Sequence, residues 1–302
     1  MFCPGPGDSS GPKDHVPAPL NVLTIDVEEY FHTAVFQRAV SDARRACLWR
    51  GAGQGARAFE SRCAEPLSWL LDVLEARRQR ATFFCLGVFA ESHPRLIKQI
   101  ARRGHEVACH GHEHRSVKEM DPGRFRDDVL RASDAIVGAC GQVPVGYRAP
   151  GFSLGPGDRR HHEVLRDLGF RYDSSVFPVA LAGPDHARAA RLPWGICPGL
   201  WELPVAVAGW GPVRLPLGGV FFRALPYRAT AMALSSMNKD KTPAMLYFHP
   251  WEFDDGQPRL AGIGPVDRVR QYWGLAASRD KFARLCAGFR FMAAVDALDL
   301  LA

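Results

Sequence analysis

The sequence lacks the features that mark secreted, disulfide-stabilised or membrane-spanning proteins. None of its eight cysteines forms a CxxC pair, and several lie in apolar runs such as residues 83–86, so we predict buried free thiols instead of a disulfide framework. The first 20 residues contain neither a basic start nor an apolar segment, and no stretch of about 18 apolar residues occurs. We therefore expect a cytoplasmic protein without a membrane-spanning segment.

Lysine is scarce as well, so the formal net charge of +6 is carried by arginines that are scattered along the chain. Because there is no basic run and no nucleic-acid-binding motif, we interpret these charges as solvated surface and expect no nucleic-acid partner. Hydrophobic residues make up 47% and charged residues 23% of the chain, which is ordinary for a globular protein with a full core.

The chain of 302 residues has the length of a single α/β barrel domain. Residues 1–19 are rich in proline, glycine, serine and aspartate, a composition that predicts a disordered leader. Residues 20–302 are expected to form one domain with a C-terminal extension.

Strand-like and helical patterns alternate along this domain. Strands are expected at residues 21–25, 81–86, 105–108, 143–147, 170–172 and 244–248, and helices at residues 66–80, 94–103, 122–138, 158–168, 227–237 and 266–286. Residues 176–222 are less regular and are expected to form an elaborated loop or a hairpin. The alternation predicts parallel strands joined by right-handed crossovers, as in an α/β barrel.

A pair of histidines follows the third of these strands. His110 and His114 are four residues apart, so on a helical turn their imidazoles share a face and suit a borderline-soft divalent ion. His112 would point elsewhere, and we expect it at the surface or behind the metal ligands. A metal hydrolase needs a third protein ligand and an open position for water.

Acidic residues at the end of the first strand supply candidates for that ligand. In a strand, alternate residues face the same side, so Asp26 and Glu28 can address one site while Val27 enters the core. We predict Glu28 as the third ligand, with Glu29 as the alternative, and Asp26 as a general base. An acidic cap at a strand-to-helix junction is the competing interpretation.

Two further motifs follow strands later in the chain. Arg148 carries a permanently charged guanidinium that can hold a carboxylate through two parallel bonds, although a surface ion pair is the alternative. His249 follows an apolar run and is either a functional histidine or a buried structural one. The carboxyl ends of strands are where α/β folds carry their active sites.

These four stretches, in this order, resemble the motifs of polysaccharide deacetylases of the NodB-homology (carbohydrate esterase 4) type. The stretches are TIDVEE (residues 24–29), CHGHEHRS (109–116), GYRAP (146–150) and YFHPWE (247–252). The closer likeness is to a subgroup found with bacterial exopolysaccharide loci. The resemblance implies an irregular (β/α)7 barrel in a single catalytic domain and a divalent metal cofactor, for which we expect zinc.

The same resemblance implies roles for individual residues. Arg148 would orient the base Asp26, the backbone N–H of Gly151 would bind the developing oxyanion, and His249 would protonate the leaving amine. The chain departs from the family where two adjacent aspartates are usual, and where an aspartate usually follows the histidine. The partner that orients His249 is therefore open, with Asp173 as a candidate.

The predicted activity is metal-dependent hydrolysis of N-acetyl groups from N-acetylhexosamine units of a glycan, a bacterial exopolysaccharide or its precursor, with release of acetate. Trp251 and Tyr147 are expected to contact this N-acetylated oligo- or polysaccharide substrate. Two alternatives are a hydrolase of another amide, such as a cyclic imide or ureide, and a non-catalytic carbohydrate-binding protein.

Overall fold

A single sheet organises the computed structural model, which describes residues 21–39, 60–209, 214–240 and 244–300. Its eight strands follow the order β10-β1-β2-β3-β4-β5-β7-β6, and all but β6 run parallel. Their bounds are β1 Asn21–Val27, β2 Thr82–Cys85, β3 Glu106–Cys109, β4 Gly146–Tyr147, β5 Tyr172–Asp173, β6 Trp194–Cys197, β7 Leu200–Glu202 and β10 Ala244–Phe248. Seven parallel strands in a curled, open sheet confirm the predicted irregular (β/α)7 architecture.

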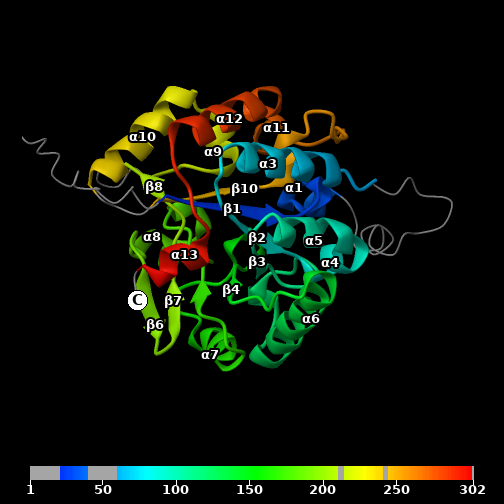
Figure 1. Cartoon of the computed structure of the whole chain (residues 1–302), viewed down its shortest axis with the longest axis vertical. Helices are drawn as coiled ribbons and strands as arrows, with labels where there is room; N and C mark the ends of the chain where they lie inside the picture. Colours follow the sequence, from blue (N-terminus) through cyan, green and yellow to red (C-terminus); the bar gives the residue numbers. More distant parts are fainter. Residues whose placement is uncertain (1–20, 40–59, 210–213, 241–243, 301–302) are drawn as a thin grey trace, which may run out of the picture.

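Helices lie around the outside of this sheet (Figure 1). Their bounds are α1 Ala34–Ala39, α3 Ala64–Ala76, α4 Gly87–Ser92, α5 Pro94–Arg102, α6 Pro122–Cys140, α7 Arg159–Asp167, α8 Pro184–Arg188, α9 Gly219–Ala224, α10 Tyr227–Lys239, α11 Pro265–Tyr272, α12 Ser278–Gly288 and α13 Ala294–Asp299. Short 3-10 turns occur at η1 Tyr30–His32, η2 Val117–Glu119, η3 Pro150–Phe152, η4 Ala180–Ala182, η5 Pro250–Phe253 and η6 Leu275–Ala277. No helix in the described ranges is both long and apolar enough to cross a bilayer.

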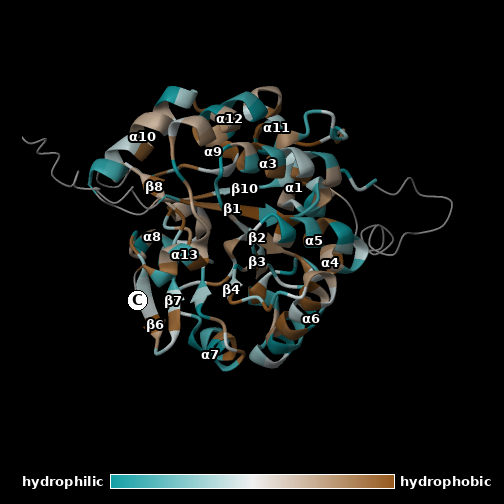
Figure 2. Ribbon diagram, in the orientation of Figure 1, coloured by the Kyte–Doolittle hydropathy of each residue, from teal (hydrophilic) through white to brown (hydrophobic). Residues whose placement is uncertain are grey.

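The strand β1 is buried along its whole length and is coloured as strongly hydrophobic in Figure 2. Leu23, Ile25 and Val27 belong to the large cluster between sheet and helices, whereas Val22 belongs to a second cluster on the other face. Because side chains alternate along a strand, Asp26 lies on the same face as Val22, inside the curve of the sheet. The prediction that Val27 enters the core is confirmed.

Local signals explain the helices that the sequence predicted well. In α6, the side chain of Asp121 accepts hydrogen bonds from the backbone N–H groups of Gly123 and Arg124, at 2.9 and 3.0 Å, and so caps the first turn. Gly141 ends the helix with a φ of 77°, a left-handed conformation that glycine adopts without strain. Helices α5, α7 and α10 also lie where the periodicity predicted them.

The predicted long helix over residues 266–286 is wrong. It is divided into α11 and α12, because the chain turns at Gly274, whose φ is 74°. A Cβ atom at Gly274 would lie 2.5 Å from the carbonyl oxygen of Arg223. Both the positive φ and this close approach therefore require glycine at the turn. The short helix α4 lies outside the helices that the periodicity predicted.

Residues 176–222 contain the β6–β7 hairpin and a small sheet of β8 (Val207–Ala208) and β9 (Leu215–Pro216), which confirms the expected hairpin. The six cysteines in the described ranges are free, four of them buried, as predicted. The predicted leader at residues 1–19 lies outside the described residues.

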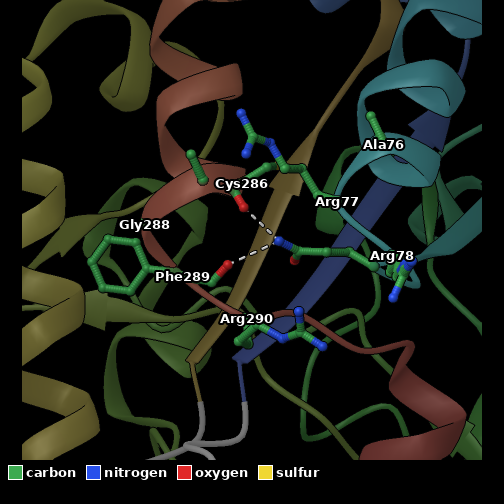
Figure 3. Close-up of a pocket in the computed structure, with 9 residues that line it drawn as sticks. Ala76, Arg77, Arg78, Cys286, Gly288, Phe289 and Arg290 are labelled. Carbon is green, nitrogen blue, oxygen red and sulfur yellow. Dashed lines mark hydrogen bonds between the residues drawn. The ribbon is translucent and has the colours of Figure 1, made fainter.

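An arginine-rich hollow of about 340 Å³ lies between the ends of α3 and α12 (Figure 3). Gln79 joins the two helices, because its side-chain amide donates to the carbonyl oxygens of Cys286 and Phe289 at 2.5 and 2.9 Å. The guanidinium groups of Arg77, Arg78 and Arg290 point in different directions in Figure 3, so they do not converge on one anion. This hollow shares no lining residue with the site described next.

Candidate metal centre and active site

Each of the four sequence motifs lies at the carboxyl end of a parallel strand. Asp26 is the penultimate residue of β1. His110 directly follows β3, Arg148 directly follows β4, and His249 directly follows β10. Parallel pairing brings these ends to one edge, since Ile25 pairs with Phe248 and Cys109 pairs with Tyr147. Strands far apart in the sequence therefore deliver polar side chains to one place.

Glu28, His110 and His114 form a compact cluster whose ligand atoms all lie within 4.8 Å of one another. The Nε2 atom of His114 is 2.6 Å from Oε2 of Glu28. The two histidines do not share a helical turn, as the spacing had suggested. They lie in an irregular loop in which His114 has a φ of 56° and Gly111 a φ of 74°, and this left-handed backbone turns both imidazoles toward Glu28.

Neighbouring groups orient these three side chains. The Nδ1 atom of His110 lies 2.8 Å from the carbonyl oxygen of Arg148, which can only accept, so Nδ1 carries the proton and Nε2 keeps its lone pair. The indole N–H of Trp251 donates to Oε1 of Glu28 at 3.0 Å. The side-chain amide of Gln37 lies 3.2 Å from Nδ1 of His114. Such outer partners are typical of metal sites.

The donor set fits a divalent cation. Oε2 of Glu28 is buried and, among the described residues, has no hydrogen-bond partner of acceptable geometry. Burial would raise the pKa of Glu28, but the adjacent His114, with His249 and His110, lowers it, so the carboxyl is ionised. Burial also lowers the pKa of His110 to about 4 and keeps its imidazole neutral. One ionised carboxylate and two imidazoles form a common zinc-binding set.

The structure distinguishes Glu28 from its neighbour Glu29. The carboxylate of Glu29 accepts hydrogen bonds from the hydroxyl of Ser61 and from the backbone N–H groups of Arg62 and Cys63. Glu29 therefore faces the start of α3, and only Glu28 faces the two histidines. The ligand role of Glu28 stays a prediction that this placement favours.

Asp26 and Arg148 form a buried ion pair inside the curve of the sheet. Nη1 of Arg148 donates to Oδ1 of Asp26 at 2.6 Å. The expected pair of parallel bonds is not formed, because the other guanidinium donors bind the hydroxyl of Thr24 and both the carbonyl and hydroxyl oxygens of Ser174. Arg148 thus fixes one oxygen of Asp26 and leaves the other, Oδ2, 3.9 Å from His249.

His249 is oriented by Glu252, a partner that the sequence analysis did not identify. Oε2 of Glu252 accepts from the backbone N–H of His249 at 3.1 Å and lies 3.2 Å from its Nδ1. Arg223 donates to the other oxygen of Glu252 at 2.7 Å. Burial would lower the pKa of His249, but the bond to Glu252 and the charge of Glu28 raise it to about 9. A cation at Glu28 would oppose this rise.

Asp173, the candidate partner of His249, lies elsewhere. It pairs in register with Tyr147 and so shares that residue's face of the sheet, away from Asp26 and His249. Its Oδ1 atom accepts from the hydroxyl of Ser175 instead. The prediction that Asp173 orients His249 is wrong, because Asp173, like its register partner Tyr147, points to the outer face of the sheet.

Asp26, Glu28, both histidines of the pair and His249 line a single hollow of about 310 Å³. The other lining residues are Thr33, Ala34, Gln37, Ser116, Pro150, Gly151, Phe152, Ser153 and Trp251. Phe152 has a φ of 55°, which is strained for a residue with a side chain, and it follows Gly151, whose φ of 60° glycine adopts without strain. The ring of Trp251 stacks on His249 at 5.0 Å but is only 8% exposed, so most of its surface is unavailable to a ligand.

One sequence prediction about this region is wrong, and for His112 one of the two expected positions is excluded. Tyr147 is fully buried between Phe125 and Phe170 and does not line the hollow, so it is not placed to contact a substrate. His112 is not at the surface. It is 1% exposed, its backbone N–H donates to Asp128 at 2.9 Å, and its ring contacts Glu91 at 3.1 Å.

The curled sheet of parallel strands, with a carboxylate and two histidines at its carboxyl edge, is an α/β fold with a candidate metal centre at the edge where such folds carry their active sites. Comparison with known families makes this specific. Residues 62–172 match the polysaccharide deacetylase family, and residues 174–299 match a domain of unknown function, DUF3473. The first of these segments is thus similar to polysaccharide deacetylases, and the second carries DUF3473. Both matched segments contribute strands to the same sheet.

Individual relatives agree with this assignment. Over 82 residues, the chain is 43% identical to a chitooligosaccharide deacetylase of Bradyrhizobium sp. (strain ANU 289), which covers 27% of this chain and 37% of the relative. Over 81 residues it is 30% identical to a peptidoglycan-N-acetylglucosamine deacetylase of Bacillus cereus, covering 27% of this chain and 30% of that protein. The matches thus span about a third of each relative's length.

A solved structure supports the fold over a larger part of the chain. It is a provisionally assigned polysaccharide deacetylase from Mycobacterium smegmatis, with a TM-score of 0.58 and 22% sequence identity. The match covers 94% of this chain and 91% of that one, so the fold is shared almost throughout.

Proposed function

We propose that this protein is a zinc-dependent deacetylase that hydrolyses N-acetyl groups on N-acetylhexosamine units of a glycan. The observation that carries the proposal is the convergence of Glu28, His110 and His114 with Asp26 and His249 on one hollow. A metal-ligand set, a fixed carboxylate and an oriented histidine are the parts that metal-assisted amide hydrolysis needs.

Glu28, His110 and His114 would hold the cation. When bound there, a divalent cation would polarise the amide carbonyl and make water more acidic. Zinc is the ion of choice because two imidazoles and a carboxylate, with a remaining open position, are typical of catalytic zinc sites.

Asp26 takes the proton of the attacking water. Arg148 is completely buried and holds Oδ1 of Asp26 in place, so Oδ2 is the oxygen that accepts this proton. As water adds to the acetamide carbonyl carbon, negative charge develops on the carbonyl oxygen. The backbone N–H of Gly151, at the rim of the hollow, donates to that oxygen.

His249 then completes the reaction. Its Nε2 atom, 3.9 Å from Asp26 and 3.7 Å from Glu28, donates a proton to the amide nitrogen as the C–N bond breaks. Glu252 accepts from Nδ1 and stabilises the protonated imidazole, while Arg223 keeps Glu252 ionised. The products are acetate and a free amino sugar.

The substrate class rests on the named relatives, which act on chitooligosaccharide and on peptidoglycan N-acetylglucosamine. A bacterial exopolysaccharide or its precursor is the substrate that we favour within this class, from the likeness of the TIDVEE motif to the subgroup found with exopolysaccharide loci.

The test is an acetate-release assay with the purified, zinc-loaded chain. The substrates are N-acetylglucosamine oligomers of increasing length and a partly acetylated exopolysaccharide. Hydrolysis of a cyclic imide, which releases no acetate, is followed in parallel by formation of the ring-opened acid. Release of acetate from the glycans supports the proposal. Turnover of the imide alone would point to another amide hydrolase, and glycan binding without any turnover would point to a carbohydrate-binding protein.

A further inference from the structure

A second group of acidic and histidine side chains is buried away from the active site. His162 of α7, Asp173 of β5 and Glu202 of β7 have relative exposures of 2%, 0% and 0%. Each offers one ligand atom, and these atoms lie within 4.8 Å of one another. Asp173 and Glu202 pair in register on adjacent parallel strands, so their carboxylates point to the same face, toward α7.

Each of these side chains is only partly satisfied by the protein. Oδ1 of Asp173 accepts from Ser175 at 2.5 Å, and Oε1 of Glu202 accepts from the backbone N–H of Val176 at 2.9 Å. Within the described part of the chain, the second oxygen of each carboxylate and both ring nitrogens of His162 have no hydrogen-bond partner. Buried polar atoms are rarely left in this state, and here three of them, one from each side chain, lie within 4.8 Å of one another.

In the described part of the chain, no lysine or arginine forms an ion pair with either carboxylate. The nearby guanidinium of Arg148 donates to Asp26, Thr24 and Ser174 instead. Burial and the adjacent carboxylate of Asp173 raise the pKa of Glu202 well above its usual value. Glu202 therefore holds its proton more tightly than a solvated carboxyl does, and a divalent cation bound beside it would displace that proton.

We propose that His162, Asp173 and Glu202 bind a second divalent cation, which has a structural role. Nε2 of His162 lies 3.5 Å from Oδ2 of Asp173 without forming a hydrogen bond. Two ligand atoms at about 2.1 Å from one tetrahedral ion are separated by about 3.4 Å, so this spacing fits a shared ion better than a direct bond. An imidazole and two carboxylates suit zinc or another borderline first-row metal, and their charges balance its two positive charges.

This ion would fasten the two matched segments of the chain together. His162 belongs to the polysaccharide deacetylase match, Glu202 belongs to the DUF3473 match, and Asp173 stands between them. The site also lies close to the residues that surround Arg148, which positions Asp26. The hydroxyl of Ser175, which donates to Asp173, accepts from the backbone N–H of Ala149, and Ser174 binds Arg148.

The test is the metal content of the full chain, measured by mass spectrometry after zinc loading and removal of free ion. We expect two ions per chain for the unmodified protein, and one each for Glu202→Gln and for the double variant His110→Ala/His114→Ala. The matched control is Glu106→Gln, because Glu106 is also buried but is satisfied by Thr82, Tyr172 and Val295. This control should keep two ions.

Thermal unfolding distinguishes a bound metal ion from the alternative, in which the carboxyl groups of Asp173 and Glu202 share a proton. With a bound ion, Glu202→Gln lowers Tm, and a chelator lowers the Tm of His110→Ala/His114→Ala, whose active-site ligands are gone. An unchanged or raised Tm for Glu202→Gln, with two ions still bound, would overturn the proposal. If Glu202→Gln does not fold, the double variant decides. One bound ion per chain in the double variant supports the second site, and no bound ion overturns it. This result does not depend on the outcome of the glycan assays.

Discussion

Two clusters in this molecule contain the same kinds of side chain in different surroundings. Glu28, His110 and His114 line a hollow of about 310 Å³ inside the curve of the sheet. His162, Asp173 and Glu202 lie between the sheet and a helix, with no more than 2% of any side chain exposed. The first cluster can admit a substrate, whereas the second can only hold an ion.

The difference lies in the groups around each cluster. At the open cluster, a backbone carbonyl orients His110 and the indole of Trp251 orients Glu28. Asp26 and His249, the proposed base and acid, lie 3.9 Å apart in the same hollow. At the closed cluster, hydrogen bonds from Ser175 and Val176 hold one oxygen of Asp173 and one oxygen of Glu202. Ligand type alone therefore does not distinguish a catalytic site from a structural one, whereas access and supporting groups do.

The largest effect is expected from removing a ligand of the open cluster. His110→Ala and His114→Ala should each release one bound ion per chain and reduce turnover by at least about 10³-fold, because stabilisation by the ion is worth several kcal/mol. Metal analysis and acetate release measure both effects. His93→Ala is the control, since His93 stacks on Phe89 outside the site. Unchanged metal content in both ligand variants would discard the open site.

The next effect concerns the acid. His249→Ala should lose about 10²- to 10⁴-fold in activity toward N-acetylglucosamine oligomers, and far less toward an aryl acetate ester, because a phenolate leaves without protonation. Metal content should not change. Equal losses on both substrates would remove His249 as the acid.

A smaller effect is expected from the indole that orients Glu28. Trp251→Phe keeps an aromatic ring beside His249 but removes the hydrogen bond to Oε1 of Glu28. Outer partners of this kind contribute about 10- to 100-fold to metal affinity, and a zinc competition titration measures this. If affinity is retained while only KM rises, Trp251 contacts substrate and does not position the ligand.

The smallest effect should come from Tyr147, which lies outside both clusters. Its hydroxyl is buried and has no hydrogen-bond partner among the described residues, so Tyr147→Phe should leave KM unchanged and Tm unchanged or slightly raised. Thermal unfolding and steady-state kinetics suffice to check this. A clear rise in KM would restore Tyr147 as a substrate contact.

The position of the open cluster was predictable from the sequence because it depends on a regular feature. Polar residues that follow apolar strands must gather at the carboxyl edge of a parallel sheet, and Asp26, His110, Arg148 and His249 all do so. The same alternation argues against Tyr147, since its neighbour Arg148 points inward and Tyr147 must then point outward.

Other features depend on tertiary contacts that no local pattern shows. The choice of Glu28 over Glu29 is made by Ser61 and the start of α3, more than 30 residues away in the chain. The two histidines meet through left-handed backbone and not through a helical turn. Glu252 could have been found, because it stands three residues after His249, the spacing of a capping interaction.

The central claim is that Asp26 activates water beside an ion held by Glu28, His110 and His114. The most direct measurement is the rate of acetate release per bound ion, compared between the unmodified chain and Asp26→Asn at equal zinc content. The unmodified chain should release acetate and free amine in equal amounts. Asp26→Asn should bind zinc equally but turn over at least about 10²-fold more slowly. Equal rates per bound ion in the two proteins, or loss of zinc from Asp26→Asn, would contradict the account.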